Sequence, residues 1–372
     1  MKKATLCNKR KLGENLLRLN RFPMITKYSF IKNLLFKNDV YYITENNDWI
    51  ITQIGKQIRK SLNRIGIKSS VTVTQKGIYN SVIHYGSINT FYPECNRLIM
   101  PHKSNKTIVT YFHVVPGDKR LADIKKIDGF VDIWHTACNK TKNDLIKIGI
   151  PQEKIRVVPV GIDLGFFKPV SQEEKNTLRL KLGIPQGSIV IGSFQKDGIG
   201  WDEGLEPKLI KGPDLFCEAV KTLAKKYPVY VLLTGPARGY VKNKLEDSKI
   251  PYRHSFVRRS ELPKLYGILD LYLITSKIEG VPMSVLECMA TQTPFVTTRV
   301  GLAPDIIRDL DNGLLCDIDD IDEVVRKSQL LIEDNNLREK IAFNMGRDIL
   351  KFSWENIIRE YKEKLYSELI AC

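Results

Sequence analysis

Apolar residues along this chain recur with two different periods, and the two kinds of segment alternate. Short apolar runs typical of buried strands occupy residues 40–44, 70–74, 81–84, 107–112, 130–136 and 155–159 of the first half. After the first run, an apolar stripe with helical spacing is formed by Ile50, Ile54, Ile58, Leu62 and Ile65. Strands that alternate with helices predict a parallel α/β fold.

The same alternation begins again in the second half of the chain. Strand-like runs lie at residues 188–193, 229–234 and 271–274, and helical patterns at 213–226, after Pro282, and at 355–370. Pro282 suits the first turn of a helix, because its ring presets φ and its missing N–H would be unpaired there. Since 372 residues are many for one core, the pattern predicts two domains.

Two carboxylates stand out in the stretch from Ser276 to Pro294, S-K-I-E-G-V-P-M-S-V-L-E-C-M-A-T-Q-T-P. Glu279 lies in a Gly/Pro turn after a strand, and Glu287 lies about two turns into the following helix. The start of a helix suits a phosphate, and a carboxylate suits the hydroxyls of a sugar or ribose. A pair of glutamates alone is most often solvated surface, so the surrounding string decides its meaning.

That string, S-x-x-E-G-x-P-x-x-x-L-E-x-M-A, resembles the signature of retaining, nucleotide-sugar-dependent glycosyltransferases of family 4. The string G-I-P-x-x-K-I-x-V-x-P-x-G-I-D-x-x-x-F-x-P at residues 149–169 is similar to the end of their N-terminal domain, and F-S-W at 352–354 to their final helix. The resemblance implies the GT-B fold, with two Rossmann-like α/β/α domains facing a central cleft. The implied domains are an acceptor-side domain at 1–166, a nucleotide-sugar domain at 167–350, and a C-terminal helix at 351–372 that crosses back to the first domain.

The resemblance implies transfer of a sugar from a nucleoside diphosphate, with retention and with protein cations in place of a metal. Lys211, in K-G-P-D at the start of a helix, is the implied diphosphate ligand. The family usually has an arginine where this chain has Ser193, and a long loop over 197–210 follows. Lys196 is therefore our choice for the second cation, with Lys208 behind it, although Lys196 could also be an ordinary loop lysine.

The remaining site positions follow from the same resemblance. Glu279 is expected at the sugar and its reacting face, and Glu287 at the ribose. His113 ends a predicted strand, and the C-terminal ends of parallel strands face the ligand cleft, so we expect it on the acceptor side of the sugar. The other expected donor-binding residues are Gly280, Val281 and Met283 at the helix start and Val257 and Arg258 in the loop after the preceding strand.

The net charge of +16 lies entirely in the first half, because residues 1–165 hold 28 Lys and Arg against 12 Asp and Glu. This asymmetry indicates an anionic partner such as a membrane surface, a lipid-phosphate acceptor or nucleic acid, or else a merely solvated basic face. The seven dispersed cysteines and the missing C-x-x-C pair indicate a reduced, cytoplasmic protein.

We therefore predict a cytoplasmic glycosyltransferase, peripheral at the inner membrane face, that uses a UDP- or GDP-linked sugar, a carbohydrate or lipid-linked acceptor and no cofactor or metal. The expected role is surface glycan or glycolipid synthesis. Two alternatives remain open. One is a non-catalytic nucleotide- or glycan-binding protein, favoured by the missing arginine. The other is a nucleic-acid-directed glycosyltransferase, which would also explain the charge.

Overall fold

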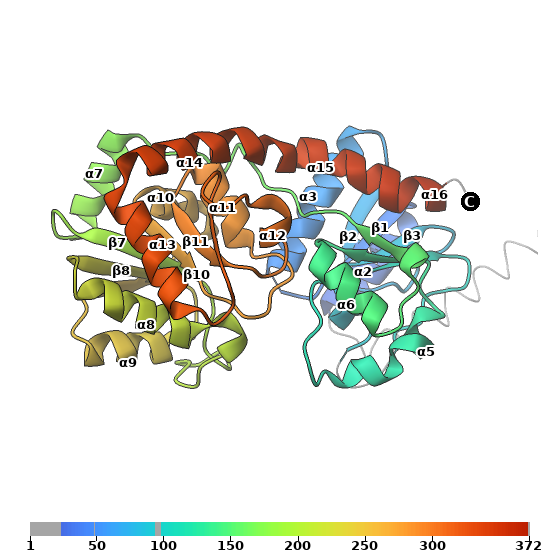
Figure 1. The fold of residues 1–372 in the computed structure, drawn as a ribbon. Coiled ribbons are helices and arrows are strands. Elements are labelled where there is room, and N and C mark those ends of the chain that lie inside the picture. Colours follow the sequence, from blue (N-terminus) through green and yellow to red (C-terminus); the bar gives the residue numbers. More distant parts are fainter. Residues whose placement is uncertain (1–23, 48, 94–97, 371–372) are drawn as a thin grey trace, which may run out of the picture. The chain divides into compact units, whose positions relative to one another are not determined.

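The computed structural model describes residues 24–47, 49–93 and 98–370, and Figure 1 shows it as a ribbon. The described residues form two six-stranded sheets, with strand orders β2-β1-β3-β4-β5-β6 and β12-β11-β10-β7-β8-β9. The strands of the first sheet are β1 Val40–Ile43, β2 Ser69–Thr72, β3 Val82–Tyr85, β4 Lys106–Thr110, β5 Ile133–Thr136 and β6 Ile155–Val157. Those of the second are β7 Ile189–Phe194, β8 Val229–Thr234, β9 Tyr252–Ser255, β10 Leu271–Ile274, β11 Phe295–Thr298 and β12 Leu314–Cys316. The strand pairs from β2 to β5, and all pairs of the second sheet, are parallel, which confirms the predicted α/β class.

Helices lie between the strands, as the alternating pattern predicts. In the first half they are α2 Met24–Leu35, α3 Ile50–Arg64, α4 Ile88–Phe91, α5 Ile124–Asp128 and α6 Asn139–Lys147. In the second half they are α7 Gln172–Lys181, α8 Pro213–Ala224, α9 Gly239–Asp247, α10 Leu262–Gly267, α11 Met283–Thr291, α12 Ala303–Ile306, α13 Ile321–Glu333 and α14 Asn335–Asp348. The chain ends in α15 Trp354–Tyr361, one π-helical turn at Lys362–Tyr366, and α16 Ser367–Ile370.

Several strands of the first sheet are shorter than their apolar runs, and β4 and β5 are examples. The run 107–112 forms a strand only to Thr110, because the Phe112 carbonyl accepts a hydrogen bond from the Thr141 hydroxyl at 2.8 Å. The run 130–136 begins as a turn, in which the Phe130 N–H donates to the Ile127 carbonyl at 3.0 Å. An apolar run shows burial but does not show where ladder hydrogen bonds begin and end.

Contacts group the described residues into two compact units. The first comprises the chain up to Thr110 together with 119–135 and the C-terminal segment from Lys362, and the second comprises 111–118 and 136–361. The predicted domain boundaries at 166 and 350 remain predictions.

In the first unit, α3 buries Ile54, Ile58 and Leu62 against the sheet, so its apolar stripe is a packing face. His84 lies fully buried on β3, where its Nδ1 is 2.7 Å from the Tyr366 hydroxyl and its Nε2 is 2.8 Å from the Thr110 hydroxyl. Burial, and the neighbouring His135, hold the pKa of His84 well below its ordinary value. The C-terminal segment is thus fastened to the first sheet, as the GT-B fold class predicts.

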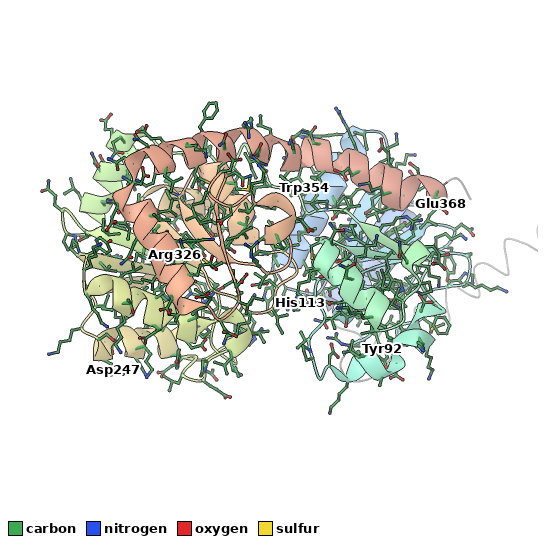
Figure 2. All side chains as sticks on the ribbon, in the orientation of Figure 1. Tyr92, His113, Asp247, Arg326, Trp354 and Glu368 are labelled. Carbon is green, nitrogen blue, oxygen red and sulfur yellow. The ribbon has the colours of Figure 1, made fainter. Side chains whose placement is uncertain are left out.

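The buried apolar residues of the second unit form one large core cluster. Every residue of β8 is buried, as is usual for a parallel strand covered on both faces. Helices α8 and α9 pack together, and α13 packs on β10, β11 and β12 (Figure 1). Trp354, labelled in Figure 2, fills the space next to Gly161, where a Cβ atom would lie 2.6 Å from the indole ring. The F-S-W motif therefore packs directly on the G-I-D motif of residues 161–163.

Candidate active site

Two loops at the carboxyl edge of the second sheet are joined by hydrogen bonds. The N–H groups of Lys277 and Ile278, after β10, donate to the Ile210 carbonyl at 2.9 and 3.1 Å, and the Thr275 hydroxyl donates to the Gly212 carbonyl at 2.8 Å. Gly212 has φ of +62°, and a Cβ atom there would lie 1.9 Å from the Thr275 carbonyl oxygen. Only glycine fits this turn, which begins α8 and presents the residue before it, Lys211.

Lys211 and Glu279 meet where these loops join. The Lys211 Nζ forms an ion pair and a hydrogen bond with Glu279 Oε1, and the Ser276 hydroxyl donates to the same oxygen at 3.2 Å. The two side chains keep 22% and 12% of their surface exposed, so both remain within reach of a ligand. Two residues predicted for the donor site, 68 positions apart in the sequence, are thus in direct contact.

The strand order explains why the site lies here. The order of the second sheet is β9-β8-β7-β10-β11-β12. The strands β7, β8 and β9 follow one another in one direction, and β10, β11 and β12 follow one another in the other, so the order reverses between β7 and β10. Ligands of open α/β sheets bind outside the carboxyl ends of the strands at this reversal. Lys196 follows β7, and Glu279 follows β10.

Three lysines, Lys196, Lys208 and Lys211, form what we call the lysine cluster. Burial lowers the pKa of Lys208, and Lys211 and Lys196 lower it further, whereas Glu279 raises it. The Lys196 Nζ lies 3.6 Å from the centre of the Trp201 ring, a cation–π contact. The structure brings together both predicted cations and the reserve candidate, Lys208.

Sequence reasoning missed Arg238, which lies next to the position of the family's arginine. Its guanidinium is fully buried, donates to the Ser193 hydroxyl and carbonyl at 3.1 Å each, and forms a 3.1 Å ion pair with Asp197. Burial raises the pKa of Asp197 to about 6, against the opposing effect of Arg238. Because Arg238 also donates to the Gln195 carbonyl, it fixes the turn that carries Lys196. No motif marks an arginine of this kind.

Helix α11 carries the second glutamate of the signature. Glu287 is buried with 7% exposure, and its Oε2 accepts a 2.7 Å hydrogen bond from the Tyr266 hydroxyl. Burial raises the pKa of Glu287, whereas the Tyr266 hydrogen bond and the charge of Arg259 lower it. Neither Tyr266 nor Arg259 was among the predicted ligands. Tyr266 lies on α10, which packs against α11, and Arg259 lies in the turn directly before α10.

The other predicted donor-binding residues are placed less uniformly. Gly280 packs on the Phe112 carbonyl, where a Cβ atom would lie 2.0 Å from the oxygen. Val281 and Met283, at the start of α11, are partly buried against the core, and so is Val257. The Arg258 side chain is 87% exposed and lies 3.7 Å from a Glu261 oxygen, so no contact of its own draws it to the lysine cluster.

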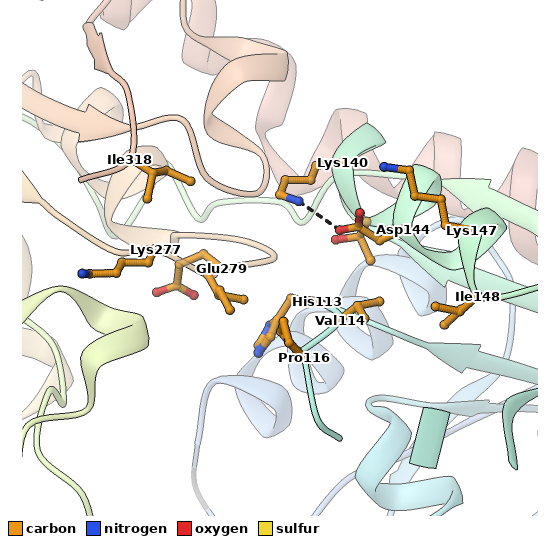
Figure 3. A pocket seen from close by; sticks show the side chains of 12 residues that line it. His113, Val114, Pro116, Lys140, Asp144, Lys147, Ile148, Lys277, Glu279 and Ile318 are labelled. Carbon is orange, nitrogen blue, oxygen red and sulfur yellow. Dashed lines mark hydrogen bonds and ion pairs between the residues drawn. The ribbon is translucent and has the colours of Figure 1, made fainter. Parts of the chain in front are cut away.

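A cavity of about 370 Å³ opens beside Glu279, lined by parts of 113–116, 140–148 and 277–279, all within the second unit. Figure 3 shows the Glu279 carboxylate and the His113 imidazole on its border. Lys277, also on the border, pairs with Asp214 at 3.3 Å and Asp319 at 2.6 Å. Across the described residues, no three His, Cys, Asp or Glu side chains gather as metal ligands.

Comparison with known proteins places this geometry in context. Residues 205–345 match the family model of the glycosyl transferases group 1. A D-inositol 3-phosphate glycosyltransferase of Corynebacterium jeikeium is 29% identical over 68% of this chain and 61% of its own length. An N,N'-diacetylbacillosaminyl-diphospho-undecaprenol alpha-1,3-N-acetylgalactosaminyltransferase of Campylobacter jejuni is 29% identical over 60% and 57%. The chain thus spans about three fifths of the length of these curated relatives.

Solved structures share the fold. The Anabaena Alr3699/HepE structure in complex with UDP and glucose has a TM-score of 0.72 at 17% identity, covering 89% of this chain and 100% of that one. Sucrose-phosphate synthase from Thermosynechococcus elongatus has a TM-score of 0.71 at 15% identity, covering 90% and 100%. Residues 205–345 therefore match the glycosyl transferases group 1 family model, within a two-sheet α/β architecture that matches the GT-B fold of these solved structures.

Proposed function

We propose that this chain is a retaining glycosyltransferase that moves a sugar from a nucleoside diphosphate to a carbohydrate or lipid-linked acceptor. The observation that carries the proposal is the contact of Lys211 with Glu279 at the strand-order reversal, beside a cavity of about 370 Å³. Cations for a diphosphate and carboxylates for hydroxyls stand together there, which is the combination that a nucleotide sugar needs.

In the proposed donor complex, the lysine cluster and the start of α11 hold the diphosphate. A diphosphate carries more negative charge than one carboxylate, so it competes with Glu279 for Lys211. Release from Lys211 leaves Glu279 free to accept hydrogen bonds from the sugar hydroxyls. Glu287, held through Oε2 by Tyr266, accepts from the ribose.

The chemistry that we propose rests on positioning and charge. The bond from the anomeric carbon to the diphosphate breaks, a bond to an acceptor hydroxyl oxygen forms on the same face of the sugar, and the hydroxyl proton passes to the departing diphosphate oxygen. The lysine cluster stabilises the departing diphosphate without a metal. Glu279 and His113 border the cavity and fix the sugar between them.

The first test is thermal unfolding of the protein with UDP, GDP, ADP or CMP, without added metal. A nucleotide at about 100 times its Kd stabilises the native state by about 2.7 kcal/mol, a shift of several degrees. We expect UDP or GDP to give this shift and Glu287→Ala to abolish it, relative to the variant's own melting temperature. No shift with any nucleotide would instead favour a non-catalytic, glycan-binding protein.

The second test separates binding from turnover. Glu279→Ala should abolish sugar transfer while the nucleotide shift is retained, because the variant also frees Lys211 for the diphosphate. Glu339→Ala, at an exposed glutamate on α14 of the same unit, is the matched control and should transfer at the native rate. Transfer by Glu279→Ala at a near-native rate would refute the role of this residue.

The acceptor and the location remain proposals of the same kind. Relatives named for inositol 3-phosphate and for an undecaprenol-linked sugar support an acceptor in glycolipid or surface glycan synthesis. Among the described residues, every helix is too short or too polar to cross a bilayer. We propose a cytoplasmic protein that meets the membrane from one side.

A further inference from the structure

Helix α2, Met24–Leu35, presents one stripe of apolar residues to solvent, although the two residues that it buries fully are polar. Met24, Tyr28, Ile31 and Leu35 are 85%, 69%, 42% and 71% exposed. At 3.6 residues per turn, these four positions form one stripe along the helix. The residues that α2 buries are instead Ser29 and Asn33. This polarity is the reverse of that of an ordinary surface helix.

The inward face is fixed by specific contacts, so the orientation of the helix is well determined. The Asn33 amide donates to the carbonyls of Thr74 and Lys76 at 2.9 and 3.0 Å. Phe30 and Leu34 lie against Gly77, about 3.1 Å from where its Cβ would be. A rotation that buried the stripe would break both amide hydrogen bonds and leave Asn33 facing solvent.

Basic residues flank the stripe. Lys27 lies on one side of it and Lys32 on the other, and α2 contains no acidic residue. Lys37 follows the helix, and Phe36 beside it is 62% exposed. Long lysine side chains can lay their methylene stems along an apolar surface and carry the charge to its rim. An apolar stripe between two lysines is the pattern of helices that lie in a membrane interface.

Helix α3 provides the contrast within the same unit. Its sequence is more regularly amphipathic, but the central residues of its apolar stripe, Ile54, Ile58 and Leu62, are buried on the sheet, and only Ile50 and Ile65 at its two ends are exposed. In the basic half of the chain, the continuous exposed apolar stripe therefore lies on α2 and not on α3. Residues 1–165 hold all of the +16 net charge, which complements an anionic partner.

We propose that α2 docks on an anionic lipid bilayer, with Met24, Tyr28, Ile31 and Leu35 entering the interface and Lys27 and Lys32 contacting lipid phosphates. Burial of the stripe removes apolar surface from water, and the lysines are attracted to the negative leaflet. This inference rests on the membrane contact proposed above and assigns the surface that makes it, but it does not depend on sugar transfer. The acceptor could still be a soluble carbohydrate, and vesicle binding needs no donor.

The test is co-sedimentation of the full-length protein with vesicles of phosphatidylcholine containing about one third phosphatidylglycerol, at low salt. We expect binding to these vesicles and at least tenfold weaker binding to pure phosphatidylcholine or at about 1 M salt, where charges are screened beyond ~3 Å. Failure of the unaltered protein to bind the anionic vesicles overturns the proposal.

Matched variants then locate the surface. Tyr28→Ser with Leu35→Ser should weaken binding at least tenfold, since each loses a large apolar side chain from the interface. Leu180→Ser with Phe343→Ser, which are 77% and 72% exposed in the second unit, should bind as the unaltered protein does. Equal binding by the two double variants overturns the proposal.

Charge is tested in the same way. Lys27→Gln with Lys32→Gln should weaken binding by about fivefold per lysine, whereas Lys125→Gln with Lys126→Gln, exposed on α5 and equal in net charge, should have a smaller effect. Sedimentation velocity excludes a second copy as the occupant. A dimer that the Tyr28/Leu35 variant dissociates, without vesicle binding, overturns the proposal. All variants should keep the nucleotide shift, so loss of membrane binding and failure of the donor site are distinguishable.

Discussion

Replacement of Gly212 by alanine should damage both stability and nucleotide binding, because it separates the two loops that join Lys211 to Glu279. The new Cβ atom would lie 1.9 Å from the Thr275 carbonyl oxygen, where a carbon normally keeps about 3.3 Å. The loops must therefore move apart by more than 1 Å, which is close to the ~1.5 Å rise of one residue along an α-helix. Three hydrogen bonds between them are lost at about 1 kcal/mol each, and the left-handed backbone costs an alanine about 1 kcal/mol more.

Gly187→Ala is the matched control, because Gly187 has φ of +80° but no atom within 4 Å of its virtual Cβ. The control should lose about 1 kcal/mol, and Gly212→Ala about 4 kcal/mol, a difference of roughly 6–12 °C in melting temperature for a unit of this size. Calorimetry of both variants, with and without UDP or GDP, measures this. If the two variants melt together, or if Gly212→Ala keeps the full nucleotide shift, the proposed coupling of the turn to the site is wrong.

Three further changes test the electrostatics of the site. Tyr266→Phe should cost about 1–3 kcal/mol at neutral pH and less in acid. Folding raises the pKa of Glu287, so the protein loses stability as the pH rises through that pKa. Without the Tyr266 hydrogen bond the ionised carboxylate is held less well, so the variant should lose more stability over the same pH range. Urea unfolding from pH 4.5 to 8 measures this difference. Burial raises the pKa of Asp197 to about 6, so between pH 4 and 7 the native protein should lose about 3 kcal/mol of stability relative to Asp197→Asn. The opposite trend would show that the ion pair with Arg238 outweighs the effect of burial. Lys208→Met should weaken UDP or GDP binding about tenfold in calorimetric titration. Lys196→Met should weaken it less, because the Lys196 ammonium already contacts the Trp201 ring. The reverse order would show that Lys196 is the main diphosphate ligand.

Much of the fold was predictable from local pattern. The fully apolar run Leu271–Ile274 forms β10 with the predicted bounds, and so does the run 229–234, which forms β8. Pro282 marks the start of α11 as predicted, but it is the N-cap residue directly before the helix and not a residue of its first turn. These features depend on neighbours in sequence, so composition and spacing were sufficient to place them.

The partners of the site residues were not predictable in the same way. Nothing in the spacing of residues 211 and 279 requires their contact; it follows from the sheet order, which puts β7 next to β10. Tyr266 reaches Glu287 because α10 packs on α11. Arg238 is 45 positions from Ser193 in the sequence, and no motif predicts that its guanidinium contacts the Ser193 hydroxyl. Such contacts depend on tertiary packing, which local patterns do not encode.

The missing arginine and the long loop after β7 are parts of one structural change. The loop folds back as a hairpin, with the Ile199 N–H donating to the Glu206 carbonyl at 2.9 Å and the Lys208 N–H to the Asp197 carbonyl at 2.7 Å. Its tip is fastened to α9, where the Gly239 N–H donates to the Glu203 carbonyl at 2.7 Å. This hairpin returns Lys208 to the side of Lys211, in partial burial that lowers its pKa. A bound diphosphate would stabilise the charged form of Lys208 and raise its pKa again. The hairpin therefore brings a third cation to the lysine cluster.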